Sequence, residues 1–159
     1  MIESEELDLV IDSFEGLTDQ YECTPLLSES ILLCVPADAP INHGLEQYCI
    51  LPKDLQNGSI RPDEIPSLPI RHFENEKFIL LKSGHNMHYR AMRAFEAAGI
   101  SPGVRFFVDQ LNISYAIAES GMGVCFVTDT FVRYARPREN IRLYKISEEP
   151  NPRTLYIAY

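Results

Sequence analysis

Short apolar runs, separated by polar turns and amphipathic segments, organise the middle of this chain. Runs at 78–81, 104–108 and 124–127 are each followed by a polar turn and then by apolar residues at helical spacing. Three such units in succession predict strands joined by crossover helices, as in an open α/β sheet. Each strand end leads into a helix N-terminus, where free N–H groups and the helix dipole favour an anion. Because ligands of open α/β sheets bind at the carboxyl ends of strands, the pattern indicates a small-molecule cleft.

The first amphipathic segment predicts a helix over residues 87–98. Gly99 supplies its left-handed C-terminal cap, and Arg90 and Arg93 are expected on the solvated face. The expected apolar stripe consists of Ala91, Met92, Phe95 and Ala98.

The second amphipathic segment predicts a helix over residues 110–120, with Asp109 as its N-cap. A third, short helix is expected after Asp129. The expected buried stripe of the second helix consists of Ile113, Ala116 and Ile117.

The remaining apolar segments predict further strands on both sides of this region. A polar, turn-like stretch is expected at 15–25, and a proline-rich loop with one helical turn near Asp54 at 51–76. The further predicted strands are residues 7–11, 30–35, 141–146 and 154–159.

Composition and charge narrow the class of protein. A chain of 159 residues allows one domain or two small lobes, and its net charge of −9 argues against binding a nucleic-acid backbone unaided. No run approaches the roughly 20 apolar residues of a membrane span, and the acidic N-terminus is unlike a secretory signal. The four cysteines form no CxxC pair, so we expect reduced, mostly buried thiols in a cytoplasmic protein without a metal site.

Five segments in order carry a family resemblance that covers the chain from Leu7 to Tyr159. They resemble the effector-binding domain of LysR-type transcriptional regulators. The block around Gly121 and Gly123, at its distance from the strand at 78–81, is the most specific part of the likeness. The five segments are Leu7–Ile11, Leu32–Pro40, Phe78–Leu81, Phe95–Ile100 and Ala118–Val124.

The resemblance implies an α/β, periplasmic-binding-protein-like fold of two Rossmann-type lobes. It places 1–36 and 130–159 in lobe one and 37–129 in lobe two, with crossovers at Pro36–Pro40 and Val127–Asp129. Lobe two is expected to be complete and lobe one partial, lacking about two strands and two helices at its start. No winged helix-turn-helix DNA-binding domain is present in this sequence, so contact with DNA would need that absent domain.

In the family, the turn after the strand at 78–81 lines the effector cleft. Ser83 and Asn86 offer hydrogen bonds to an anion, Gly84 allows close backbone approach, and Lys82 or His85 adds charge. The alternative is that Ser83 or Asn86 only caps the following helix.

Residues at two further strand ends are candidates for the cleft. Thr128 follows the strand at 124–127, although an N-cap by the neighbouring Asp129 would also explain this pattern. Asp12 and Ser13 follow the strand at 7–11 and would face the cleft from lobe one.

The function expected from these observations is ligand sensing. A small, carboxylate-bearing effector would bind between the lobes and bias their closure or the dimer geometry. The resemblance also implies a homodimer, with the helix at 110–120 as the lobe-two contact, and a partial lobe one would promote self-association. An enzyme is disfavoured because no catalytic motif is found, and no cofactor or catalytic residue is expected. The alternative function is a cytoplasmic or exported solute-binding protein of the periplasmic-binding type.

Overall fold

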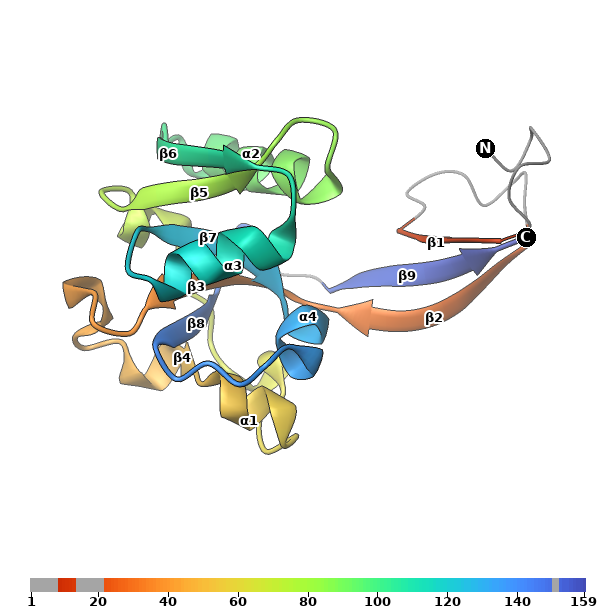
Figure 1. Ribbon diagram of the computed structural model, residues 1–159, viewed down its shortest axis with the longest axis horizontal. Helices are drawn as coiled ribbons and strands as arrows, with labels where there is room; N and C mark the ends of the chain where they lie inside the picture. Colours follow the sequence, from red (N-terminus) through yellow and green to blue (C-terminus); the bar gives the residue numbers. More distant parts are fainter. Residues whose placement is uncertain (1–8, 14–21, 150–151) are drawn as a thin grey trace. The chain divides into compact units, whose positions relative to one another are not determined.

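The computed structural model describes residues 9–13, 22–149 and 152–159, which fall into two compact units (Figure 1). The larger unit contains residues 31–149, and the smaller unit contains the other described residues.

A six-stranded sheet in the order β4-β8-β3-β7-β5-β6 forms the centre of the larger unit. β5 runs parallel to both β6 and β7, which is the arrangement that the three repeated sequence units predict. β3 is antiparallel to β7 and β8, and β8 is antiparallel to β4. The strands are β3 Ile31–Pro36, β4 Cys49–Ile50, β5 Lys77–Leu81, β6 Gly103–Val108, β7 Val124–Thr128 and β8 Ile141–Lys145.

Helices cover both faces of this sheet, because both faces carry apolar side chains. The α-helices are α1 Pro52–Gln56, α2 Asn86–Ala98, α3 Leu111–Glu119 and α4 Asp129–Tyr134. The 3-10 turns are η1 Pro40–Asn42, η2 Glu46–Tyr48, η3 Pro62–Glu64 and η4 Ile70–Phe73. The helical turn expected near Asp54 is α1, and Gly99 ends α2 in the left-handed conformation (φ 64°) as predicted.

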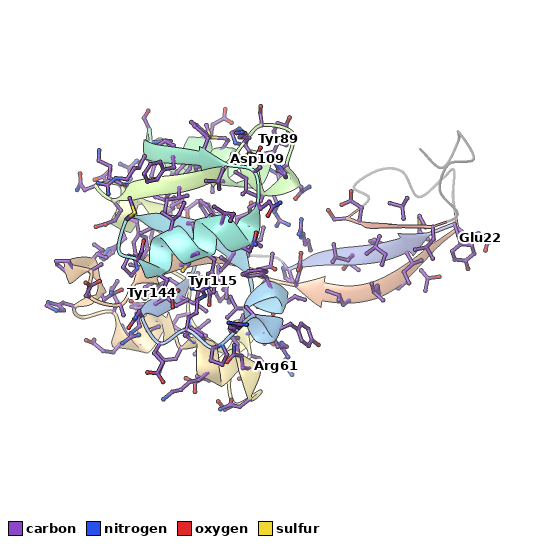
Figure 2. All side chains as sticks on the ribbon, in the orientation of Figure 1. Glu22, Arg61, Tyr89, Asp109, Tyr115 and Tyr144 are labelled. Carbon is purple, nitrogen blue, oxygen red and sulfur yellow. The ribbon has the colours of Figure 1, made fainter. Side chains whose placement is uncertain are left out.

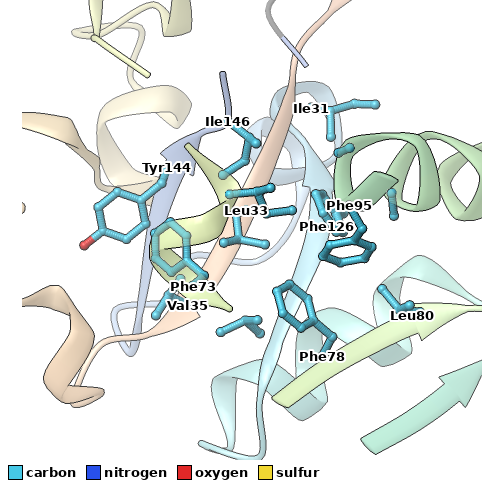
Figure 3. Packing of buried hydrophobic residues seen from close by; sticks show 14 of the residues in the cluster. Ile31, Leu33, Val35, Phe73, Phe78, Leu80, Phe95, Phe126, Tyr144 and Ile146 are labelled. Carbon is cyan, nitrogen blue, oxygen red and sulfur yellow. The ribbon is translucent and has the colours of Figure 1, made fainter. Parts of the chain in front are cut away.

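The face under α2 is packed with aromatic rings (Figure 3). Phe78 of β5 lies edge-on to Phe95 of α2, with ring centroids 4.8 Å apart, and Phe126 of β7 contacts both. Aromatic pairs of this kind add about 0.5–1.5 kcal/mol beyond the area that they bury. The opposite face packs α1, α3 and α4 around side chains that include Tyr115 and Val132.

The inward faces of the two longer helices differ from the expected stripes. Met92 of α2 is 41% exposed, and Arg90 is buried although it was expected on the solvated face. Ile113 of α3 is 45% exposed, and Ala116 is exposed as well. The buried residues are Met87, Arg90, Ala91, Ala94 and Phe95 in α2, and Ser114, Tyr115 and Ala118 in α3.

The smaller unit is a three-stranded antiparallel sheet in the order β1-β9-β2, formed by β1 Val10–Asp12, β2 Cys23–Glu29 and β9 Arg153–Ala158. The sequence pattern predicts a polar turn at 15–25 and so does not predict β2, whose first residues lie in that stretch. Proline is tolerated there because β2 is an edge strand with a bulge between Pro25 and Leu27. Glu29 and Arg153 form an ion pair that joins β2 to β9, with Arg153 Nε donating to Glu29 Oε1 at 2.5 Å.

The division of the chain differs from the predicted lobe boundaries. Those boundaries assigned both Ile31–Pro36 and Ile141–Lys145 to lobe one, whereas the structure places β3 and β8 in the larger unit. The reason is pairing: β3 forms backbone ladders with β7 on one side and β8 on the other. Pro36 therefore ends a central strand of the larger unit. That the two units are the family's two lobes remains a prediction.

Candidate functional site

Three strand ends meet at one edge of the larger sheet. Because β5, β6 and β7 are parallel neighbours, their last residues, Leu81, Val108 and Thr128, all lie at this edge. Each of the three strands leads into a helix, as the sequence pattern predicts. This is the edge where ligands bind in open α/β sheets.

The turn after β5 contains all five of the predicted cleft residues of this region, and every one of them is exposed. Gly84 has φ 100°, a conformation that side-chain-bearing residues rarely adopt, so the tight turn requires glycine here. The backbone N–H of Lys82 donates to the carbonyl of Val108 at 3.0 Å, which fixes the start of the turn against β6. The turn residues are Lys82, Ser83, Gly84, His85 and Asn86.

Two of the three helices that begin at this edge, α2 and α3, have no side-chain cap bond at their N-termini. His85 is the N-cap of α2 and Gln110 that of α3, and neither side chain accepts a bond from the first turn. Asp109 is therefore not the predicted cap of α3. It lies directly after β6 (Figure 2), and its Oδ2 accepts from Lys82 Nζ at 2.8 Å. A lysine, a carboxylate and the starts of two helices are thus gathered within one short region.

Thr128, at the end of β7, has a structural role. It is only 3% exposed, and its hydroxyl accepts from the backbone N–H of Phe131 at 3.1 Å. Thr128, and not Asp129, is therefore the N-cap of α4. Asp129 is buried within the first turn and pairs with Arg133 at 3.8 Å.

Asp12 and Ser13 belong to the smaller unit, whereas the turn residues belong to the larger one. Asp12 is exposed at the end of β1, and its carboxylate accepts from the backbone N–H of Ser13 at 2.6 Å. The Ser13 hydroxyl is buried and has no hydrogen-bond partner among the described residues.

A buried charged pair, which the sequence pattern does not predict, lies just inside α2. Arg90 Nε and Nη2 donate to Glu149 Oε2 at 3.0 and 2.5 Å, and their side chains are only 9% and 6% exposed. Arg90 lies on the helix that the candidate turn begins, and Glu149 is the last described residue of the larger unit. No sequence signal could have found this pair, because its partners lie on separate elements.

In the described part of the chain, no three His, Cys, Asp or Glu side chains are grouped so that they could hold a metal ion. Cys125 is fully buried in the core. None of the described helices has the length and hydrophobicity required to cross a bilayer.

A family model described as the LysR substrate binding domain matches residues 62–159. This chain belongs to the LysR substrate-binding domain family. The match includes β5 to β9 and the whole of the candidate turn, and it confirms the resemblance inferred from the sequence.

A curated relative and several solved structures extend this result. The relative is an uncharacterized HTH-type transcriptional regulator, YcgK, of Bacillus subtilis (strain 168), 27% identical over 119 residues that cover 75% of this chain. The regulatory domain of CcmR from Synechocystis PCC6803, solved with 2-PG, superposes with a TM-score of 0.73 at 19% identity over 99% of this chain. The effector-binding domain of QuiR, solved with shikimate, superposes with a TM-score of 0.68 at 15% sequence identity over 98% of this chain.

These likenesses establish the α/β fold of LysR effector-binding domains, which is periplasmic-binding-protein-like and has two lobes. The reduced regulatory domain of OxyR from Pseudomonas aeruginosa shares it, with a TM-score of 0.69 at 19% identity over 99% of this chain. This chain spans 36% of the length of YcgK. It spans 65%, 63% and 66% of the CcmR, QuiR and OxyR chains.

Proposed function

We propose that this chain is the ligand-sensing part of a LysR-type transcription regulator and binds a small anionic metabolite at the turn Lys82–Asn86. The observation that carries the proposal is this exposed turn, placed at the carboxyl ends of parallel strands and leading into an α2 N-terminus without a side-chain cap. Family membership supports it, and the CcmR and QuiR domains were solved with small molecules bound.

Each turn residue has a role in the proposal. The ammonium of Lys82 and the helix dipole neutralise the anion, while Ser83 and Asn86 donate hydrogen bonds. Gly84 lets the ligand approach the backbone. The Lys82–Asp109 pair is exposed (53% and 70%), and exposed pairs contribute only about 0–1 kcal/mol, so exchanging Asp109 for a ligand carboxylate costs little.

The two compact units correspond, in this proposal, to the family's two lobes. Ligand binding shifts the population between lobe arrangements, because the ligand binds one arrangement more tightly than the other. In the intact regulator, a cytoplasmic protein, this shift changes how attached winged helix-turn-helix domains meet DNA. The chemical reaction of an enzyme is not needed for this role.

A thermal-melt screen against small carboxylates, amino acids and phosphates tests the proposal. A ligand at a hundredfold excess over its Kd stabilises the folded state by about 2.7 kcal/mol, which raises Tm by roughly 5–10 °C. The shift should disappear in the Ser83→Ala/Asn86→Ala variant and persist in Ser101→Ala, which changes an exposed serine beyond the other end of α2. A ligand whose shift survives the double substitution would place the site elsewhere.

We further propose that the chain forms a homodimer in which α3 contributes a contact. Ile113 is 45% exposed on α3, and Ile11 and Leu26 are 53% and 46% exposed on the edge strands of the smaller sheet. Exposed apolar side chains on an unpaired strand edge favour association. Sedimentation velocity should show a dimer that Ile113→Glu weakens and Asn112→Glu, a change at the neighbouring exposed residue, leaves intact. A monomeric wild-type protein at high concentration would contradict this.

A further inference from the structure

The larger unit contains a cavity of about 470 Å³ between α1 and the segment that leads into β8. We name it the α1 groove: its walls are the residue after β3, residues 51–53 at the start of α1, residues 137–140 and Arg142 of β8. The α1 groove lies away from the candidate turn. Because β3 is antiparallel to β7, with Ile31 beside Thr128, the Pro36 end of β3 lies at the opposite end of the strands from the turn.

Basic side chains dominate the α1 groove. Lys53, Arg138 and Arg142 line it together with a single carboxylate, Glu139, although acidic residues outnumber basic ones in this chain by 23 to 14. Among the described residues, neither Lys53 nor Arg142 forms an ion pair, and Arg138 pairs with Glu119 of α3. Cations gathered in a concave, partly apolar wall focus a positive potential that attracts anions.

The two guanidinium groups are held in place before any ligand arrives. Arg142 Nη1 donates to the carbonyls of Glu139 and Ile141 at 3.1 and 2.8 Å. Arg138 stacks over the buried Tyr115 ring, 5.1 Å from its centroid (Figure 2 labels Tyr115), and its Nε is buried with no hydrogen-bond partner among the described residues. Oriented guanidinium forks match the geometry of carboxylate and phosphate oxygens.

The walls of the α1 groove are also tied to one another. Gln56 of α1 donates through Nε2 to the carbonyls of Val132 and Ala135, each at 3.1 Å. The backbone N–H of Ala37 donates to the carbonyl of Asn140 at 2.9 Å. The first two bonds join α1 to the end of α4, just before the 137–142 segment, and the third joins this segment to the residue after β3. Because the backbone on both sides of the cavity is held in this way, less ordering is needed on binding.

We infer that the α1 groove binds a small polyanion, with Lys53 and Arg142 as the groups that contact its oxyanion groups and Arg138 as a further source of positive charge. Its volume falls within the roughly 300–1,000 Å³ of small-molecule sites. An adjoining cavity of about 480 Å³ shares Leu51 and Arg142 but is also lined by Glu46 and Asp54, so the anion belongs on the Lys53 side of Arg142. This inference does not depend on the proposed function of the Lys82–Asn86 turn.

Titration of the ¹⁵N-labelled chain with citrate and with inorganic phosphate, followed by two-dimensional NMR, tests the inference. The amide signals of Lys53, Asn140 and Arg142 should move saturably with at least one anion, and added sodium chloride should weaken the binding. Arg142→Met and Lys53→Met should each raise the Kd by about tenfold or more, the loss expected for one charge-assisted hydrogen bond.

Arg105→Met is the matched control, because Arg105 is an exposed arginine of β6 that donates to one carbonyl, that of Met122, at 3.0 Å. It should leave the Kd unchanged. If Arg142→Met disturbs the fold, the Kd of Lys53→Met still tests the inference. This substitution should not disturb the fold, since the exposed Lys53 side chain makes no hydrogen bond among the described residues. Absence of saturable shifts with both anions, shifts confined to the Lys82–Asn86 turn, or an equal effect of Arg105→Met would overturn the inference.

Discussion

Replacing Glu149 with glutamine removes the carboxylate from a buried ion pair while keeping the volume of the side chain. In the native protein this carboxylate receives two hydrogen bonds from Arg90, and both side chains are more than nine-tenths buried. A further nitrogen of Arg90, Nη1, is buried without a partner among the described residues, so little else compensates its charge. The substitution therefore leaves a buried cation without its counter-charge.

The expected loss of stability is large for a substitution that replaces one carboxylate oxygen by an amide nitrogen. Removing one partner of a buried pair costs about 3–5 kcal/mol. At roughly 2–4 °C per kcal/mol for a chain of this size, Tm should fall by roughly 6–20 °C. The double variant Arg90→Met/Glu149→Gln should be more stable than Glu149→Gln, because it removes the unpaired charge.

Urea and thermal unfolding followed by circular dichroism measure this loss. Glu74→Gln is the control, since the Arg71–Glu74 pair is 3.5 Å long with side chains 56% and 44% exposed, and its loss should cost under about 1 kcal/mol. If Glu149→Gln were as stable as Glu74→Gln, the reasoning from burial of this pair would be refuted.

Three other properties follow from the same structure. Gly123→Ala should lower the unfolding free energy by at least about 1–3 kcal/mol in urea melts, because φ is 152° and a Cβ would clash with the carbonyl of Lys77; an unchanged midpoint would contradict this. Burial raises the pKa of Tyr115 and Tyr144, so the stability that these groups contribute is intact below about pH 10 and is lost as the pH rises further. Thermal melts at a series of pH values would show this loss, and a stability that stays constant above about pH 10 would argue against buried phenols. The acidic chain alone should give no shift of duplex DNA in an electrophoretic assay at moderate salt, and a salt-dependent shift would count against the charge argument.

Local signals allowed much of the larger unit to be predicted. The periodic pattern at 87–98 and the glycine after it located α2 to within one residue. Both signals are local, because the helical period and the left-handed cap depend only on residues close together in the sequence. The repeated strand–turn–helix units likewise predicted that the ends of β5, β6 and β7 share an edge, which their parallel pairing confirms. The position of the Lys82–Asn86 turn could therefore be predicted, although its role as a binding site remains a proposal.

What the sequence could not show depends on residues that are far apart in the chain. The helical pattern placed Arg90 on the solvated face, because its partner Glu149 lies in a distant segment of the chain. The same pattern placed Met92 in the buried stripe, although Met92 is exposed. The segment 111–119 carries two apolar faces, and the pattern selected the one with Ile113 whereas packing selected the one with Tyr115. The α1 groove combines three segments that only the folded chain brings together.

The position of β3 has a consequence for how the larger unit forms. Leu33 pairs with Phe126 on one side and with Tyr144 on the other, so this central strand finds neither neighbour until most of the chain has been made. Such non-local pairing slows folding, because the entropy of closing long loops is lost before the contacts form. The run Ile31–Val35 is fully apolar and is buried in the native state. During synthesis it stays without its strand partners until β7 and β8 have been made. Such an unpaired apolar run is prone to aggregation during synthesis, and a chaperone would be expected to shield it.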